Sequence, residues 1–184
     1  MANMTNKSQI TLINGSCAEQ EVDAIVNAAN GGLWAGGGIC GAIFKKAGMS
    51  QLTDACKAIK TPVEDGGAVM TPSFNISSAK VIIHAVGPNF SATPTAFDKL
   101  FDAYYNSLVL LKDKGYHSIS FPLISSGIFG GSLDNPAAES TKQCCRAYEK
   151  FTEDYPDYPV DVRLCAFSPK EMTAAIDEFA KHTL

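Results

Sequence analysis

The sequence predicts an α/β protein, a three-layer α/β/α sandwich built on a mostly parallel, mixed sheet of about six strands. Five short runs are almost wholly apolar, at 10–13, 23–27, 80–86, 118–124 and 162–167, and a weaker sixth lies at 67–74. Uninterrupted apolar runs are typical of strands that are buried on both faces of a sheet. Helical patterns alternate with them along the chain, which indicates parallel strands joined by helical crossovers.

Three longer helices and two shorter ones are expected between these strands. Apolar residues recur at helical spacing from Phe97 to Leu111, so one helix is predicted to begin at Thr93-Pro94 and to end at Gly115. A second follows Asn135-Pro136. The last begins at the capping sequence Ser168-Pro169-Lys170-Glu171. This last helix is expected to bury Met172, Ala175, Ile176 and Phe179, and the two shorter helices are expected at 39–47 and 50–59.

The composition narrows the class of protein. The 184 residues are 46% apolar and 18% charged, which predicts one compact domain over 1–184 with a flexible N-terminus at 1–8. The net charge is -4 and basic residues are scattered, so nucleic acid is not an expected partner. The polar N-terminus lacks a hydrophobic segment, so we expect a cytoplasmic monomer without a membrane partner. Six cysteines form no CxxC pair, which predicts buried free thiols and no metal site.

Glycine is concentrated just after the strand at 23–27. Seven of the fifteen glycines lie between Gly31 and Gly48. Glycines at 36–38 would place bare amides at a helix N-terminus, where phosphate is favoured. The stretch SSGIFGG at 125–131 follows another strand and adds amides and two hydroxyls. Either loop alone is more simply an ordinary turn, but together they predict a diphosphate ligand. Neither is a GxxxxGK[ST] or a GxGxxG motif.

Four stretches carry a family resemblance. VDAIVNAAN at 22–30, the triple glycine followed by GAI, HAVGP at 84–88 and PLISSGIFGG at 122–131 resemble the macrodomain family over nearly the whole chain. The similarity is greatest to the MacroD-like branch and to viral macrodomains. It implies ADP-ribose as the ligand and an enzyme that removes ADP-ribose from proteins or deacetylates O-acetyl-ADP-ribose, without a cofactor. ADP-ribosylated proteins would then be partners.

The resemblance also implies roles for individual residues. Asn30 matches the asparagine that holds the distal ribose and orients the attacking water, and Phe129 matches the aromatic residue against that ribose, which makes these two the catalytic candidates. Phe167 matches the aromatic residue that stacks near adenine. The other implied ligand-binding residues are Ser16, Cys17, Ala28, Gly36, Gly37, Gly38, Ile39, Cys40, Ser125, Ser126, Gly127, Ile128 and Gly130.

Two positions depart from the family pattern. Ser16 stands where an aspartate usually accepts the adenine amino group, so a weaker grip on adenine is expected. Cys40 stands where MacroD-like hydrolases carry an aspartate that helps to activate water. Viral members lack that carboxylate too, so the departure weakens the expectation of catalysis and does not remove it.

Alternatives stay open for several of these residues. A water attacking the anomeric carbon would be positioned by Asn30 and would pass its proton to a ligand phosphate oxygen. Cys40 at a helix N-terminus could instead be a nucleophile, but no histidine is tied to it, and a packed thiol is favoured. His84 is interpreted as a satisfied core residue, and Asn27 as a cap at the strand end. Trp34 is either an exposed lid or packed on the sheet edge.

A reader module that binds ADP-ribose without chemistry is the alternative function. The lost carboxylate at Cys40 favours the reader. The single-domain length favours the enzyme, which is the function we predict.

Overall fold

A computed structural model describes residues 7–184 and contains one six-stranded sheet in the order β1-β6-β5-β2-β4-β3. Every neighbouring pair is parallel except β3 and β4, which are antiparallel. The strands are β1 (Gln9–Asn14), β2 (Ala24–Ala29), β3 (Ala68–Pro72), β4 (Val81–Val86), β5 (Ser118–Pro122) and β6 (Asp161–Ala166). The predicted mostly parallel, mixed sheet is confirmed, and the weaker sixth run is the antiparallel edge strand β3.

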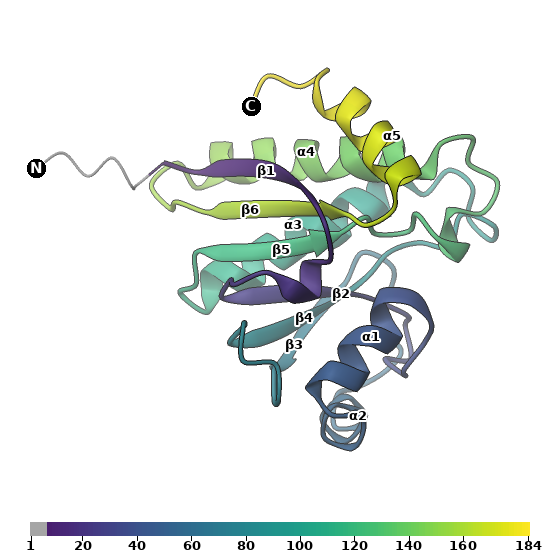
Figure 1. The fold of residues 1–184 in the computed structure, drawn as a ribbon, viewed down its shortest axis with the longest axis vertical. Coiled ribbons are helices and arrows are strands. Elements are labelled where there is room, and N and C mark those ends of the chain that lie inside the picture. Colours follow the sequence, from purple (N-terminus) through teal and green to yellow (C-terminus); the bar gives the residue numbers. More distant parts are fainter. Residues whose placement is uncertain (1–6) are drawn as a thin grey trace, which may run out of the picture.

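Helices cover both faces of this sheet (Figure 1). One face carries α1 (Gly38–Ala47), α2 (Met49–Lys57) and the short 3-10 helix η1 (Cys17–Glu19); the other carries α3 (Phe97–Asp113), α4 (Pro136–Asp154) and α5 (Pro169–Phe179). A second 3-10 helix, η2 (Ile128–Gly130), lies in the loop after β5. The three-layer prediction is therefore confirmed.

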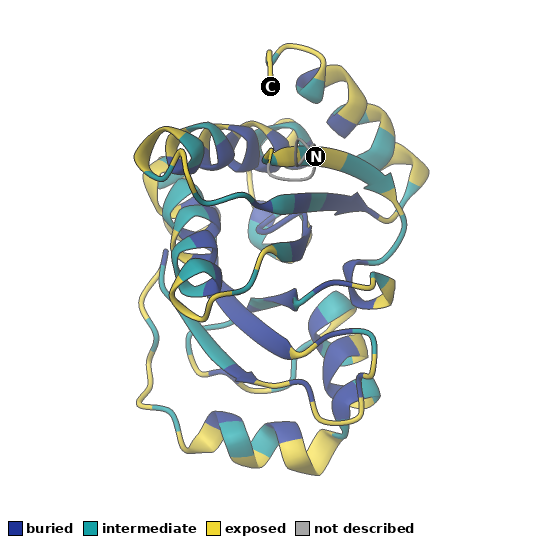
Figure 2. Cartoon of the chain, turned by 90° about the vertical axis from the view of Figure 1, so that its left-hand side faces the viewer, coloured by how far each residue is buried: buried dark blue, intermediate teal, exposed yellow. Residues whose placement is uncertain are grey.

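The central strands show why the apolar runs are uninterrupted. Along β2, Ala24 and Val26 belong to the apolar cluster beneath α3 and α4, whereas Ile25 and Ala29 belong to the cluster beneath α1 and α2. Alternate residues of a strand point to opposite faces, so a strand covered on both faces must be apolar at nearly every position. Figure 2 shows the result, with mostly buried strands and helices that carry a buried stripe and an exposed one.

A series of hydrogen-bonded polar side chains crosses the core from β2 through β4 to β3. The His84 ring is fully buried; its Nδ1 lies 3.0 Å from Asn27 Nδ2, and its Nε2 lies 2.9 Å from Thr71 Oγ1. Burial lowers the pKa of His84 to about 4, so the imidazole is neutral. The interpretation of His84 as a satisfied core residue is confirmed. The interpretation of Asn27 as a strand cap is wrong, because β2 continues to Ala29 and Asn27 lies inside it.

Two expectations about helices are corrected. The third helix begins at Phe97 and not at Thr93-Pro94, because the amides of Ala92 and Thr93 bond to the Asn89 carbonyl in a separate turn. In α5, Ile176 is 50% exposed and Glu178 is buried in its place. The packed face of α5 passes through Met172, Ala175 and Glu178, and Phe179 is only half-buried. A residue adjacent to Ala175 is turned about 100° away from that face.

The expectation of a flexible N-terminus at 1–8 stays a prediction, whereas the expectation for the thiols can be compared with the structure. Residues 1–6 lie outside the described residues, while Ser8 Oγ accepts a hydrogen bond from the Val160 amide at 3.1 Å. All six cysteines are free and buried, as predicted. Between residues 7 and 184, no helix combines the length and the apolar character needed to cross a membrane.

Candidate functional site

The predicted loops meet at the edge of the sheet where the parallel strands end, on the right in Figure 1. The loop after β2 leads to α1 on one face, and the loop after β5 leads to α4 on the other. Neighbouring strands β2 and β5 pair only through Ala24 with Ile119 and Ile25 with Ser120, so they separate before their carboxyl ends. Parallel sheets bind ligands at such points.

The first loop is fastened by the side chain of Asn30, the residue that follows β2. Asn30 Nδ2 donates to the Trp34 carbonyl at 2.9 Å, and the Trp34 amide donates to Asn30 Oδ1 at 3.2 Å. A carboxamide carries two donor hydrogens and two acceptor lone pairs on its oxygen. Asn30 therefore holds the loop and keeps one N–H and one lone pair for another partner.

Cys40 contributes to the same fastening from the first turn of α1. The Gly36 amide donates to its sulfur at 3.4 Å, and the thiol lies 3.8 Å from the Trp34 carbonyl. The side chain is buried, and its hydrogen-bond partners among the described residues are main-chain groups. These contacts favour a packed thiol over a nucleophile, since none of them would take up the thiol proton as a base.

The N-terminus of α1 presents bare amides. Among residues 7–184, no acceptor is found for the amides of Gly37, Gly38 and Ile39. Gly38 has φ +58°, in the left-handed region that favours glycine. A Cβ added at Gly37 or Gly38 would meet nothing within 4 Å. Open space beside orphan donors at a positive helix end is an arrangement that binds phosphate.

Trp34 lies against its own loop and remains 64% exposed. A Cβ at Gly32 would come within 2.7 Å of the indole Cδ1, and one at Gly36 within 3.8 Å of Cζ3. Glycine at 32 is therefore needed for the indole to take this place. Of the two alternatives for Trp34, the structure supports the exposed one.

The second loop, 125–131, follows β5 and uses its hydroxyls internally. Ser125 has φ +59° and donates through Oγ to the Pro88 carbonyl at 2.7 Å. Ser126 Oγ donates to the Leu123 carbonyl at 2.7 Å and lies 3.2 Å from Glu171 Oε2. A hydroxyl has one proton, so neither serine has a donor left over. The expectation that these hydroxyls bind phosphate is corrected: only the amides of this loop have free donors.

Five amides of the second loop, those of residues 125–129, are unpaired within the described part of the chain. The Ile128 side chain is 92% exposed. Phe129 is half-buried, and its carbonyl accepts from the Phe90 amide at 2.8 Å. Gly130 is buried, and a Cβ there would come within 2.8 Å of Pro136. The loop thus presents main chain and one apolar side chain outward.

Of the residues expected near adenine, Phe167 is exposed, whereas the side chains of Ser16 and Cys17 bond within the protein. Phe167 follows β6 and is 75% exposed. Ser16 Oγ accepts from the Ala18 amide at 3.2 Å and so caps η1. The Cys17 thiol is turned inward toward the Val26 carbonyl, 3.4 Å away, and burial raises its pKa. Cys17 can therefore offer a ligand its main chain but not its thiol, and its place among the ligand-binding residues stays a prediction. Ala28 is half-buried in β2.

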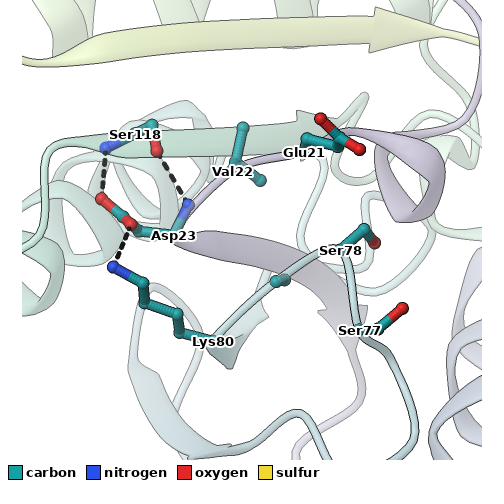
Figure 3. A pocket seen from close by; sticks show the side chains of 8 residues that line it. Glu21, Val22, Asp23, Ser77, Ser78, Lys80 and Ser118 are labelled. Atoms are coloured by element: carbon teal, nitrogen blue, oxygen red, sulfur yellow. Dashed lines mark hydrogen bonds and ion pairs between the residues drawn. The ribbon is translucent and has the colours of Figure 1, made fainter.

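The opposite edge of the sheet carries a pocket of about 300 Å³ (Figure 3). At this pocket, Asp23 makes an ion pair with Lys80 at 3.0 Å and accepts from the amides of His117 and Ser118, whereas the buried hydroxyl of Ser78 has no partner among the described residues. Burial raises the pKa of Asp23, but these hydrogen bonds outweigh it and hold the pKa below its usual value.

Sequence reasoning missed Glu171 as part of the site. It was expected only to cap α5, and it does so: the Ser168 amide donates to Glu171 Oε1 at 3.3 Å, and the Glu171 amide donates to Ser168 Oγ at 3.1 Å. Its second oxygen reaches Ser126 in the loop after β5. No local signal in the sequence links residues 45 positions apart.

Comparisons with known proteins agree with this arrangement. Residues 26–140 match the Macro domain family. An O-acetyl-ADP-ribose deacetylase of Salmonella typhimurium is 39% identical over 80% of this chain and 82% of its own length. The mouse ADP-ribose glycohydrolase MACROD1 is 37% identical over 89% of this chain, which spans 49% of that protein.

A solved structure of the Oceanobacillus iheyensis macrodomain with ADP superimposes with a TM-score of 0.84 and 31% identity. The match covers 96% of this chain and 92% of that one. The resemblance drawn from the sequence is thereby confirmed, and the chain belongs to the macrodomain family.

Proposed function

We propose that this protein binds ADP-ribose across the two glycine loops and hydrolyses mono-ADP-ribose from acidic side chains, O-acetyl-ADP-ribose, or both. The observation that carries the proposal is Gly37. Neither its φ of -85° nor any neighbour within 4 Å requires a glycine there, but a ligand lying on the main chain would. The names of the Salmonella and mouse relatives supply the identity of that ligand.

The diphosphate would lie between the two sets of unpaired amides. The amides of Gly37, Gly38 and Ile39 come from the loop after β2, and those of residues 125–129 from the loop after β5. Both loops are at the edge where β2 and β5 separate. Preorganised amides stabilise anionic oxygens without lysine or arginine.

Hydrolysis of the linkage to an acidic side chain would proceed by attack of water on the anomeric carbon of the distal ribose. The bond to the acidic side chain breaks and that carboxylate leaves, while the water proton passes to a ligand phosphate oxygen. Asn30 would position the reactants with the N–H and lone pair that Trp34 does not use. The loop amides would stabilise the negative charge as it moves.

The proposal keeps the assignments of Phe167 to the adenine ring and of Phe129 to the distal ribose. Ser16 would accept from the adenine amino group as a neutral partner, which predicts weaker selectivity for adenine than a carboxylate provides. We also propose that the protein is a cytoplasmic monomer and that it needs no metal. These proposals rest on the sequence alone.

A reader without catalysis is the second candidate. It is favoured by one observation, the Cys40 thiol, which supplies no carboxylate and is bonded to the main chain of Gly36. Binding of ADP-ribose is common to both candidates, so it is tested first and turnover is tested separately.

The test of binding is a calorimetric titration with ADP-ribose. A Gly37→Ala variant is expected to bind about tenfold more weakly, because its methyl group would occupy the ligand's place against the main chain, at unchanged melting temperature. Gly115→Ala, which strains a left-handed residue (φ +79°) between α3 and β5, controls for a general loss of stability. Undetectable binding by the wild type, or equal binding by Gly37→Ala, would contradict the proposal.

A further inference from the structure

Glu171 joins two segments that the strands leave unconnected. The last paired residues of β5 and β6 are Pro122 and Cys165, so the loop 125–131 and the turn at Phe167–Ser168 extend beyond the sheet. One carboxylate spans them: Oε1 accepts from the Ser168 amide at 3.3 Å, and Oε2 lies 3.2 Å from Ser126 Oγ. We call this the Glu171 bridge.

The same loop is held differently on its other side. Ser125 Oγ donates to the Pro88 carbonyl, and the Phe90 amide donates to the Phe129 carbonyl. A Cβ at Gly131 would come within 2.4 Å of the Ser91 nitrogen, so the main chains are in direct contact there. Ser126 Oγ shares its one proton between the Leu123 carbonyl at 2.7 Å and Glu171 Oε2 at 3.2 Å. Across residues 7–184, the Glu171 bridge is the one polar link from this loop to the β6–α5 turn.

The location of Glu171 makes the bridge stable without a basic partner. Glu171 occupies the third position of α5, within a complete capping box with Ser168. A carboxylate in the first turn is stabilised by the positive end of the helix. The helix thus holds the carboxyl group in place, and Oε2 is a fixed acceptor for Ser126 Oγ.

We propose that Glu171 is a positioning residue that sets the spacing between the phosphate loop 125–131 and the turn at Phe167–Ser168. The inference rests on the proposed function, in which these two segments bind the diphosphate and the adenine of one ligand. A ligand that touches both segments depends on their spacing, whereas a ligand that touches one does not. The bridge therefore contributes to the affinity for adenosine diphosphates and not to that for pyrophosphate.

The test compares variants that keep or lose the bridge. Glu171→Gln keeps an oxygen for the Ser168 amide and presents a carboxamide NH2 group that can donate to Ser126 Oγ. This variant is therefore expected to bind ADP and ADP-ribose with the affinity of the wild type. Glu171→Ala is expected to bind both about tenfold more weakly, the loss that one charged hydrogen bond explains. Its affinity for pyrophosphate should stay within about twofold, because that ligand has no adenine.

Two further variants isolate the bridge from the helix cap. Lys170→Ala, at an exposed neighbouring position of α5, should bind all three ligands as the wild type does. Combining Ser126→Ala with Glu171→Ala should add no loss beyond that of Ser126→Ala alone, since both changes break the same link. The melting temperature of each variant is measured on the same sample, so that a loss of ligand affinity can be distinguished from unfolding.

The outcomes separate the inference from the function on which it rests. If the wild type binds no ADP-ribose, the proposed function fails. If the wild type binds and Glu171→Ala binds equally well, only the bridge is contradicted. A loss of pyrophosphate affinity equal to the loss for ADP would also overturn the inference, because it would show damage to the phosphate loop itself.

Discussion

The two loops at the carboxyl edge are held in different ways. The loop after β2 is fastened mainly to itself, since Asn30 bonds to the main chain of Trp34 and Cys40 to that of Gly36 and Trp34, within ten residues of one another. One bond reaches farther, from the Val63 amide to the Gly31 carbonyl at 2.8 Å. The loop after β5 is fastened to segments far away in the sequence, at Pro88, Phe90 and Glu171. The first half of the site is thus held mostly by local contacts, and the second half mostly by contacts with remote segments of the folded protein.

This difference determines what each loop needs from the rest of the molecule. The first loop needs a firm strand end beneath Asn30, and β2 is tied to its neighbours by the chain from Asn27 through His84 to Thr71. The second loop needs its remote contacts. Three changes should therefore have effects of different size on stability. They act on the hydrogen bonds that support β2, on the remote contacts of the loop after β5, and on the local contacts of the loop after β2.

The largest effect is expected on acidification, through His84. Its pKa is about 4 in the folded protein and 6.5 as the ordinary value, so the unfolded chain takes up the proton first. As the pH falls from 6.5 to 4, the free energy of unfolding should fall by about 3 kcal/mol from this group, and the contribution should be fully present above pH 6.5.

Urea titrations across this pH range measure the dependence. His84→Gln, which can still bond to Asn27 and Thr71, should show a flatter pH profile than the wild type. Identical slopes in the two proteins would show that the buried imidazole is not the group responsible.

The remote fastening is tested by Gly131→Ala. Gly131 has φ +54°, and a Cβ there would come within 2.4 Å of the Ser91 nitrogen and 2.7 Å of the Phe90 carbonyl carbon. The variant should lose about 2 kcal/mol of stability, because both the conformation and the contact are unfavourable. Thermal unfolding measures the loss.

A matched glycine makes the result specific. Gly37→Ala lies in the self-fastened loop, where a Cβ meets nothing, and should unfold like the wild type. Equal losses in the two variants would contradict the difference between the loops.

The smallest effect is expected for the local fastening at Cys40. Cys40→Ala removes the acceptor of the Gly36 amide and should lower the free energy of unfolding by about 1 kcal/mol, while turnover is retained. Trp34 is the one tryptophan of the chain, so its fluorescence anisotropy reports on this loop alone and should fall. Complete loss of turnover in a folded variant would instead identify Cys40 as a nucleophile.

The same contrast explains how far the sequence predicts the structure. Strand order aside, the apolar runs locate every strand, and Ser168 with Glu171 reveals the last helix start, because these signals act between residues close in the chain. Asn30 and the glycines at 36–38 lie within nine residues of each other in the sequence, so their closeness in the fold was predictable. Periodicity could not decide between Ile176 and Glu178, because they flank Ala175 on opposite sides of the helix, about 100° and about 60° from it. Only packing in the folded protein decides that the Glu178 side is the buried one.

The contacts that escaped prediction are those made across the fold. Ser125 and Ser126 were expected to offer hydroxyls to a phosphate, and both donate to protein groups instead. The inward turn of the Cys17 thiol toward the Val26 carbonyl also has no signal in the sequence. Which polar groups remain free depends on partners that no short stretch of sequence contains.

The most direct measurement is the release of free ADP-ribose from a protein mono-ADP-ribosylated on glutamate, with this protein in excess. Wild type should complete the release, and Asn30→Ala should slow it by about 100-fold, because water and ribose lose their positioning group. Asn75→Ala, a change at an exposed asparagine in the turn between β3 and β4, should release at the wild-type rate. Release undiminished in Asn30→Ala would contradict the account, and no release from wild-type protein that binds ADP-ribose would leave it a reader.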